Sequence, residues 1–265
     1  MKNFSVIFAV WGMLLLLAGC AATPAGTDRP AEQPMSQQAA ASDAQQRAKV
    51  HTELGALYLQ KGTVAVALDE GRVALVADPG YAPAHNLMGL AYMQLRENAA
   101  AEQSFEAALR LAPNDPEINN SFGWFLCQTG RERRALDYFN VAIRAPLYVT
   151  PVMPHVNAGI CLLRLKDDDA AEGYFSRALR FDPQNTLALF SLADIAYRRG
   201  QMAVAQLRLA ELDRVTEPGA AALWLALRVA RHQGARDSEK RYAAQLQRNF
   251  PGSPEQIKLS RGEYD

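Results

Sequence analysis

The chain carries no excess of charge of either sign, with 28 basic and 28 acidic side chains among 265 residues. A neutral chain has no net attraction for nucleic acid or for an anionic membrane surface, so neither is an expected partner. The sequence also lacks the motifs of common catalytic sites: it has no P-loop, no dinucleotide-binding glycine fingerprint, no HExxH and no nucleophile elbow. Nothing therefore predicts an enzyme, a cofactor or a small-molecule substrate.

Long apolar stretches are absent after the N-terminus, where no segment reaches the roughly 18 residues expected of a membrane span. At the N-terminus, Lys2 precedes an apolar stretch over residues 4–18, the arrangement of a secretory signal peptide. The segment Leu17-Ala18-Gly19-Cys20 resembles the lipobox of bacterial lipoproteins, which implies a signal peptide over 1–19 and lipidation of Cys20. An ordinary signal peptide with an incidental cysteine and an uncleaved anchor are the alternatives. Ala21 follows where an aspartate would favour inner-membrane retention, so we expect a lipid anchor on the periplasmic face of the outer membrane.

Bulky side chains are nearly absent from residues 20–46, which are rich in Ala, Pro, Ser, Thr and Gln. Such a composition buries too little apolar surface to fold, and it predicts a disordered tether with a span of roughly 30 Å. Folding is expected to begin near Ala44. The domain that follows is predicted over 47–253, with a C-terminal tail over 254–265.

The rest of the chain is built on a periodic glycine. Gly55, Gly89 and Gly123 are 34 residues apart, and Gly159 follows after 36. Alanine stands 12 and 19 positions after each of these glycines. A 34-residue period of such residues resembles the tetratricopeptide (TPR) repeat, which implies an all-α superhelical solenoid of helix-turn-helix units.

Apolar residues recur at helical spacing in two segments of each unit, so each unit is predicted to form two helices. Glycine inside a helix costs about 1 kcal/mol relative to alanine, and close approach of two helices is the expected compensation. Gly71 stands where other units have an aromatic residue, which predicts an open floor in the first unit. Gly62, Gly130 and Gly200 fall at the end of a first helix, where a positive φ is favoured. Prolines within 145–154 predict an elbow. The six predicted units run over 48–81, 82–115, 116–149, 152–185, 186–218 and 219–252.

Cys127 and Cys161 are predicted on the first helices of adjacent units. Equivalent helices lie about 8–10 Å apart, whereas a disulfide needs Cα atoms within about 7 Å, so we expect two free thiols, at least partly buried, with a bridge between them as the alternative. His51, His85 and His155 occupy one position of successive units. The repeat places them on separate helices, so we expect packing roles and no metal site.

Function is then expected on the concave face, which the first helices line. Asn86 and Asn120 are placed to hydrogen-bond the backbone of a partner. The large apolar residues of this face either form the floor of a groove or merely pack between helices, and the sequence leaves both open. An amphipathic or extended peptide is the expected ligand. The candidate groove residues are Thr52, Leu59, Asn86, Leu90, Met93, Asn120 and Trp124.

Several segments together carry a narrower resemblance. The lipobox, the tether, six repeats, the asparagine pair in 119–126, the elbow and the late Phe-Pro-Gly-Ser at 250–253 resemble the PilF/PilW family of type IV pilus biogenesis lipoproteins. Cys127 departs from the tyrosine-like residue more usual there. The resemblance implies a pilotin, a lipoprotein that binds subunits of the outer-membrane secretin of the type IV pilus and promotes their localisation and multimerisation. A different outer-membrane TPR scaffold, organising cell-envelope machinery without a secretin, is the alternative.

Overall fold

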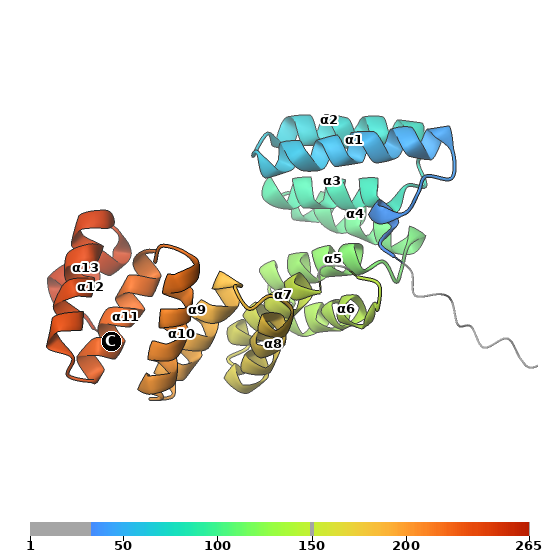
Figure 1. Ribbon diagram of the computed structural model, residues 1–265. Coiled ribbons are helices and arrows are strands. Elements are labelled where there is room, and N and C mark those ends of the chain that lie inside the picture. The colour runs from blue at the N-terminus through green and yellow to red at the C-terminus, as the bar shows by residue number, and fades with distance from the viewer. Residues whose placement is uncertain (1–32, 149–150, 265) are drawn as a thin grey trace, which may run out of the picture. The chain divides into compact units, whose positions relative to one another are not determined.

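The computed structural model describes residues 33–148 and 151–264, and within them every long regular element is a helix (Figure 1). The predicted all-α fold is confirmed. A short 3-10 helix, η1 (Met35–Gln37), precedes the α-helices. The α-helices are α1 (Asp43–Gln60), α2 (Val64–Ala77), α3 (Ala82–Gln94), α4 (Asn98–Leu111), α5 (Pro116–Gln128), α6 (Glu132–Arg144), α7 (Val152–Arg164), α8 (Asp168–Phe181), α9 (Thr186–Arg198), α10 (Met202–Val215), α11 (Ala220–His232), α12 (Arg236–Asn249) and α13 (Pro254–Arg261).

Successive helices pack in antiparallel pairs, and the pairs stack on one another. α1 packs on α2, α3 on α4, and so on to α11 on α12, while the second helix of each pair contacts the first helix of the next. These pairs are repeats 1 to 6. None of the described helices is long and apolar enough to cross a bilayer. The predicted signal peptide and Cys20 lie outside the described residues.

The periodic glycines make room for the aromatic residue of the same repeat. A Cβ on Gly123 would lie 2.7 Å from the Phe139 ring and 3.2 Å from the carbonyl oxygen of Ala135. A Cβ on Gly89 would likewise lie 2.7 Å from the ring of Phe105. Both rings are fully buried. The predicted close approach of the two helices is therefore confirmed, and the aromatic ring explains why it needs glycine.

Repeat 1 is packed as closely without an aromatic residue, so the prediction of an open floor there is wrong. A Cβ on Gly71 would lie 2.6 Å from the Met88 sulfur, and a Cβ on Gly55 would lie 2.5 Å from a Leu87 methyl group. Leu87 and Met88 belong to α3, so the next repeat fills the space that an aromatic side chain fills elsewhere.

We predict opposite signs for two glycine-to-alanine changes. Gly123→Ala will lower the free energy of unfolding by about 1–3 kcal/mol, because the methyl group overlaps the buried ring of Phe139. Gly173→Ala, in α8, will raise it by about 0.5–1 kcal/mol, because no atom lies within 4 Å of its added Cβ. Urea unfolding of the two variants measures both effects. A stabilised Gly123→Ala protein would contradict this account of the period.

The turn inside each repeat needs one residue in the left-handed region. Gly62, Gly130 and Gly200 have φ of +77°, +79° and +73°, as predicted. Arg96 and Lys166 hold the same place in repeats 2 and 4, with φ of 61° and 60°. The turn geometry is therefore set by the repeat, and glycine is the residue that adopts it most readily.

Both ends of the solenoid extend beyond the predicted limits. α1 begins at Asp43, where the Ser42 hydroxyl accepts a hydrogen bond from the Gln45 N–H. Residues 33–42, predicted as part of a disordered tether, pack on the solenoid. The predicted tail over 254–265 contains α13, and Tyr264 stacks on Trp224 with ring centroids 5.7 Å apart. Apolar contacts with the outer repeats order segments whose composition alone predicts coil.

Candidate functional site

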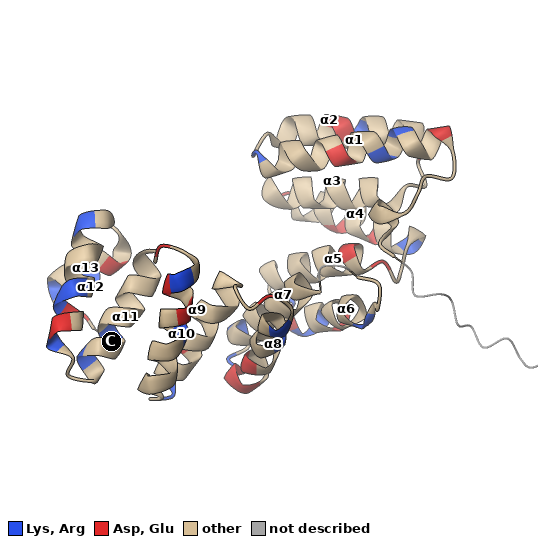
Figure 2. Cartoon of the chain, viewed as in Figure 1, with Lys and Arg blue, Asp and Glu red and all other residues tan. Residues whose placement is uncertain are grey.

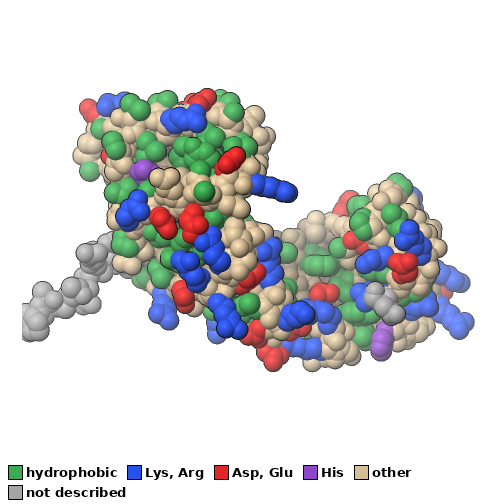
Figure 3. All heavy atoms as spheres, turned by 180° about the vertical axis from the view of Figure 1, so that it is seen from behind, with side chains coloured by type: hydrophobic (Ala, Val, Ile, Leu, Met, Phe, Trp, Pro, Cys, Tyr) green, Lys and Arg blue, Asp and Glu red, His purple; other side chains and the backbone are tan. Residues whose placement is uncertain are grey.

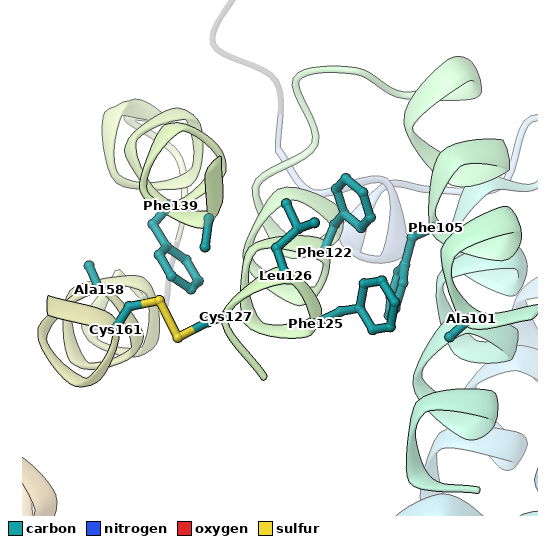
Figure 4. Close-up of a cluster of buried hydrophobic side chains, with 10 residues drawn as sticks. Ala101, Phe105, Phe122, Phe125, Leu126, Cys127, Phe139, Ala158 and Cys161 are labelled. Atoms are coloured by element: carbon teal, nitrogen blue, oxygen red, sulfur yellow. A yellow bond between two sulfur atoms is a disulfide. The ribbon is translucent and has the colours of Figure 1, made fainter. Parts of the chain in front are cut away.

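The apolar residues of the predicted groove are half-buried and take part in the packing of the stack. Leu59 packs on the buried cluster that includes Met88. Leu90, Met93 and Trp124 pack on the larger cluster shown in Figure 4. Of the two interpretations left open by the sequence, packing between helices accounts for part of each side chain. Their remaining exposed surface still lies on adjacent first helices, α1, α3 and α5.

The polar residues of the predicted groove differ in whether a hydrogen-bonding group remains for a partner. The Thr52 hydroxyl donates to the Ala48 carbonyl over 2.7 Å, and Thr52 is buried. Asn120 Oδ1 accepts from Asn157 Nδ2 at 2.9 Å. Asn86 Oδ1 is buried and has no hydrogen-bond partner among the described residues. Asn86 is therefore the one of these three with an unused buried acceptor for a partner.

A second candidate surface is the outer face of repeat 1, which no other described repeat covers (Figure 1). Three apolar residues of α1 lie on it at helical spacing: Val50 is 49% exposed, Leu54 37% and Leu57 54%. On α2, Val66 and Val73 are 39% and 45% exposed. They are seven residues apart and lie on the side of α2 opposite Leu68, which packs on α3. We call these five residues the end face.

The repeat shows what a surface of this kind does elsewhere in the stack. In α3 and α5, the residues one and two periods after those of α1 are at most 7% exposed. They pack on the second helix of the preceding repeat, as when Phe122 and Phe125 lie 5.8 and 5.4 Å from the ring of Phe105. The end face is therefore a helix-stacking surface that no helix covers among the described residues. The equivalent buried residues are Ala84, Met88, Ala91, Ile118, Phe122 and Phe125.

The sequence contained the signal for the end face, although the concave-face reasoning missed it. Val50, Leu54 and Leu57 stand 34 residues before Ala84, Met88 and Ala91. In the described residues, no repeat precedes repeat 1 to cover such a stripe. Terminal repeats of solenoids usually present a polar outer face for solubility. An apolar one indicates a binding surface. Apolar side chains reach the surface over α1 and α2 in Figure 3.

Cys127 and Cys161 form a disulfide, so the prediction of free thiols is wrong. Their Cα atoms are 5.8 Å apart, and the bridge joins α5 to α7 (Figure 4). The prediction compared a separation of helix axes with a separation of Cα atoms. Each Cα stands about 2.3 Å from its axis, so facing residues of helices 8–10 Å apart come within bridging distance. Arg164 Nη1 also donates to the Cys127 carbonyl over 2.7 Å, and Arg164 Nη2 donates to Gln128 Oε1 over 2.8 Å. The junction between repeats 3 and 4 is thus cross-linked from α5 to α7.

Each of the three histidines has a local partner of its own. His51 Nδ1 lies 2.6 Å from Glu70 Oε2, and a ring nitrogen of His85 lies 3.0 Å from the Pro79 carbonyl oxygen. His155 is buried, and burial lowers its pKa. Among the described residues, no three ligating side chains gather as a metal site would require. Acidic and basic side chains are distributed along all the repeats (Figure 2).

Comparison with known proteins finds tetratricopeptide repeat proteins, and factors of type IV pilus biogenesis are among them. A tetratricopeptide repeat family model matches residues 86–147 and 162–211. The type IV pilus assembly protein PilF of Pseudomonas aeruginosa is 27% identical over 205 residues, which are 77% of this chain and 81% of PilF. A structure from the functional characterization of Pseudomonas aeruginosa PilF has a TM-score of 0.77 at 25% identity, covering 83% of this chain and 100% of that one. The crystal structure of PilW, a widely conserved type IV pilus biogenesis factor, has a TM-score of 0.74 at 32% identity, covering 80% of this chain and 98% of that one.

Proposed function

The chain belongs to the PilF/PilW family of TPR proteins of type IV pilus biogenesis, and we propose that it acts there as a pilotin. In this role it binds subunits of the outer-membrane secretin and promotes their localisation and multimerisation. It works as a scaffold rather than an enzyme. Cys20 carries the lipid that holds the protein on the periplasmic face of the outer membrane.

The exposed end face of repeat 1 is the observation that carries the binding part of the proposal. Its three α1 side chains, Val50, Leu54 and Leu57, occupy positions that pack on a preceding helix in repeats 2 and 3. Val66 and Val73 extend this exposed apolar surface onto α2. An amphipathic helix is the ligand that reproduces this packing, with apolar residues spaced three and four apart. We therefore assign the end face to an amphipathic helix of the secretin.

The concave groove is the competing surface, because Asn86 Oδ1 is buried without a hydrogen-bond partner. A backbone N–H from an extended secretin segment would satisfy this acceptor. Asn86→Ala tests the groove with little disturbance of packing. We expect this variant to co-purify as much secretin as the wild-type protein, since the end face is intact. A loss comparable to that of end-face variants would move the site to the groove.

Lipidation gives a separate prediction. Cys20→Ala will abolish incorporation of labelled palmitate and release the protein into the periplasmic fraction, because two or more acyl chains are needed for stable anchoring. Secretin will then fail to reach the outer membrane efficiently, since each bound subunit is no longer local to that surface. Fractionation and secretin immunoblots measure both effects. A normally located secretin with soluble Cys20→Ala protein would contradict the anchoring step.

The alternative is an outer-membrane TPR scaffold that organises envelope machinery without a secretin. A deletion strain separates the two functions. The pilotin proposal expects loss of heat-stable secretin multimers and of twitching motility. The alternative expects both to persist while another envelope function fails.

A further inference from the structure

Residues 33–42 lie against the solenoid instead of forming the predicted coil, and we call this segment the strap. Figure 1 shows it, in blue before α1, passing the ends of α3 and α4 near the start of α5. Pro34 is buried, and the Met35 side chain packs on two buried clusters. One cluster includes Tyr81 and the other includes Ile118. The strap therefore bridges the starts of α3 and α5.

Polar contacts fix the strap to the first turn of α5. The Met35 N–H donates to Asp115 Oδ2 over 2.7 Å. The Ser36 hydroxyl donates to Glu117 Oε2 over 2.5 Å, and the Gln37 amide donates to Glu117 Oε1 over 3.3 Å. The other carboxylate oxygen of Asp115 caps α5 by accepting from two backbone N–H groups. Hydrogen bonds to carboxylates are stronger than those between neutral groups.

The surface under the strap, at the starts of α3 and α5, is acidic. The strap groups that contact its carboxylates are all hydrogen-bond donors. The pKa of Tyr81 is raised to about 12, first by burial and then by the negative charges of Glu53, Glu117, Asp115 and Asp78. Burial also raises the pKa of Glu117, while the hydrogen bond from the strap hydroxyl lowers it. The strap donates to two of these carboxylates, with a backbone N–H to Asp115 and with a hydroxyl and an amide to Glu117. This chemical match explains why a segment of coil-like composition is ordered here.

We infer that the strap couples the membrane anchor to repeat 3. The inference rests on the proposed lipidation of Cys20. The chain left between Cys20 and Gln33 has 12 residues, whereas the predicted tether has 26 between Cys20 and residue 47. Twelve residues reach at most about 43 Å when fully extended, whereas 26 reach at most about 94 Å. The anchor therefore leaves the solenoid at the start of α5, and a lipid surface faces this edge. The end face on repeat 1 is left free for a partner in the periplasm.

Hydrogen–deuterium exchange of the mature lipoprotein in phosphatidylethanolamine–phosphatidylglycerol vesicles tests whether the strap is docked. Met35→Asp places a carboxylate in an apolar site beside an acidic edge, so it will release the strap. Ala39→Asp is the matched control, because Ala39 is an exposed residue of the strap. We expect exchange over 33–42 to be at least about tenfold slower in the wild type and in Ala39→Asp than in Met35→Asp. Equally fast exchange in all three proteins would overturn the strap.

Photo-crosslinking to lipid in the same vesicles tests the orientation. A photoreactive residue at Asn114, just before α5, will crosslink to lipid several-fold more than one at Leu57 on the end face. Met35→Asp will remove this difference, and equal crosslinking with a docked strap would overturn the coupling. Labelled palmitate separates the two proposals. Absence of acylation on Cys20 would overturn the anchor and, with it, the coupling to repeat 3. Fast exchange over 33–42 would overturn the strap and the coupling but leave the proposed anchor in place.

Discussion

Replacing Leu54 and Leu57 together with glutamate will lower the affinity of the purified protein for the secretin by at least about a hundredfold. Both side chains belong to the end face, from which the proposed secretin helix excludes water. A carboxylate buried there has no described basic partner on the end face, so binding must either desolvate two charges or leave the helix undocked. The fold will tolerate the change, because these residues are already exposed at 37% and 54% in the free protein. Surface changes of this kind alter stability by about 0.5 kcal/mol or less.

A matched control removes the general effect of adding charge. Leu207 of α10 is 57% exposed, close to the value for Leu57, but it lies in repeat 5. Leu207→Glu will bind secretin as the wild-type protein does. Binding is measured by co-purification with detergent-solubilised secretin and by a concentration series on immobilised protein. Equal binding by the double end-face variant and the Leu207→Glu control would remove the end face from the account.

Replacing both Cys127 and Cys161 with alanine will lower the free energy of unfolding by about 3–4 kcal/mol. The bridge closes a loop with a sequence separation of 34, and its loss restores the entropy of that loop in the unfolded chain. Both residues are fully buried, so alanine keeps the junction apolar and the bridge is removed with little other change. The effect centres on the junction between repeats 3 and 4, where the bridge joins α5 to α7.

Urea unfolding under oxidising and reducing conditions measures this contribution. In oxidising buffer the double variant will unfold at lower urea than the wild-type protein. With reductant present, the two will unfold at similar concentrations, because reduction of the unfolded wild-type chain removes the same constraint. The variant will still bind secretin at low temperature, since the end face is distant in sequence from the bridge. Identical unfolding in oxidising buffer would show that the bridge contributes nothing measurable.

The fold was predictable because its determinants are local and repeated. The glycine period, the apolar spacing of paired helices and the left-handed turn residues at Gly62, Gly130 and Gly200 each predict the structure found. Where one signature residue was missing, the prediction failed. Gly71 removed an aromatic ring from repeat 1, but Leu87 and Met88 of the next repeat filled the space. Side chains of a neighbouring repeat can thus fill the space of a missing aromatic ring. This packing depends on the stack, and the sequence of a single repeat does not reveal it.

The candidate site was less predictable, for three physical reasons. The strap is ordered by tertiary contacts of Met35 and by carboxylates of Asp115 and Glu117, about 80 residues away in sequence. The disulfide depends on how Cys127 and Cys161 face one another, which helix-axis spacing does not give. The end face is exposed because no repeat precedes α1 in the part of the chain that the structure describes. The sequence reveals this surface only when the residues of α1 are compared with those 34 positions later, which are buried against the preceding repeat.

Secretin assembly in a strain deleted for this protein tests the central claim most directly. Heat-stable secretin multimers in the outer membrane are measured by immunoblot after complementation with the wild-type protein, with Leu54→Glu/Leu57→Glu, or with Leu207→Glu. The account predicts no multimers in the deletion strain, their return with the wild-type protein and with Leu207→Glu, and their absence with the end-face variant expressed at equal level. Wild-type amounts of correctly located multimers in the deletion strain would contradict the pilotin function itself.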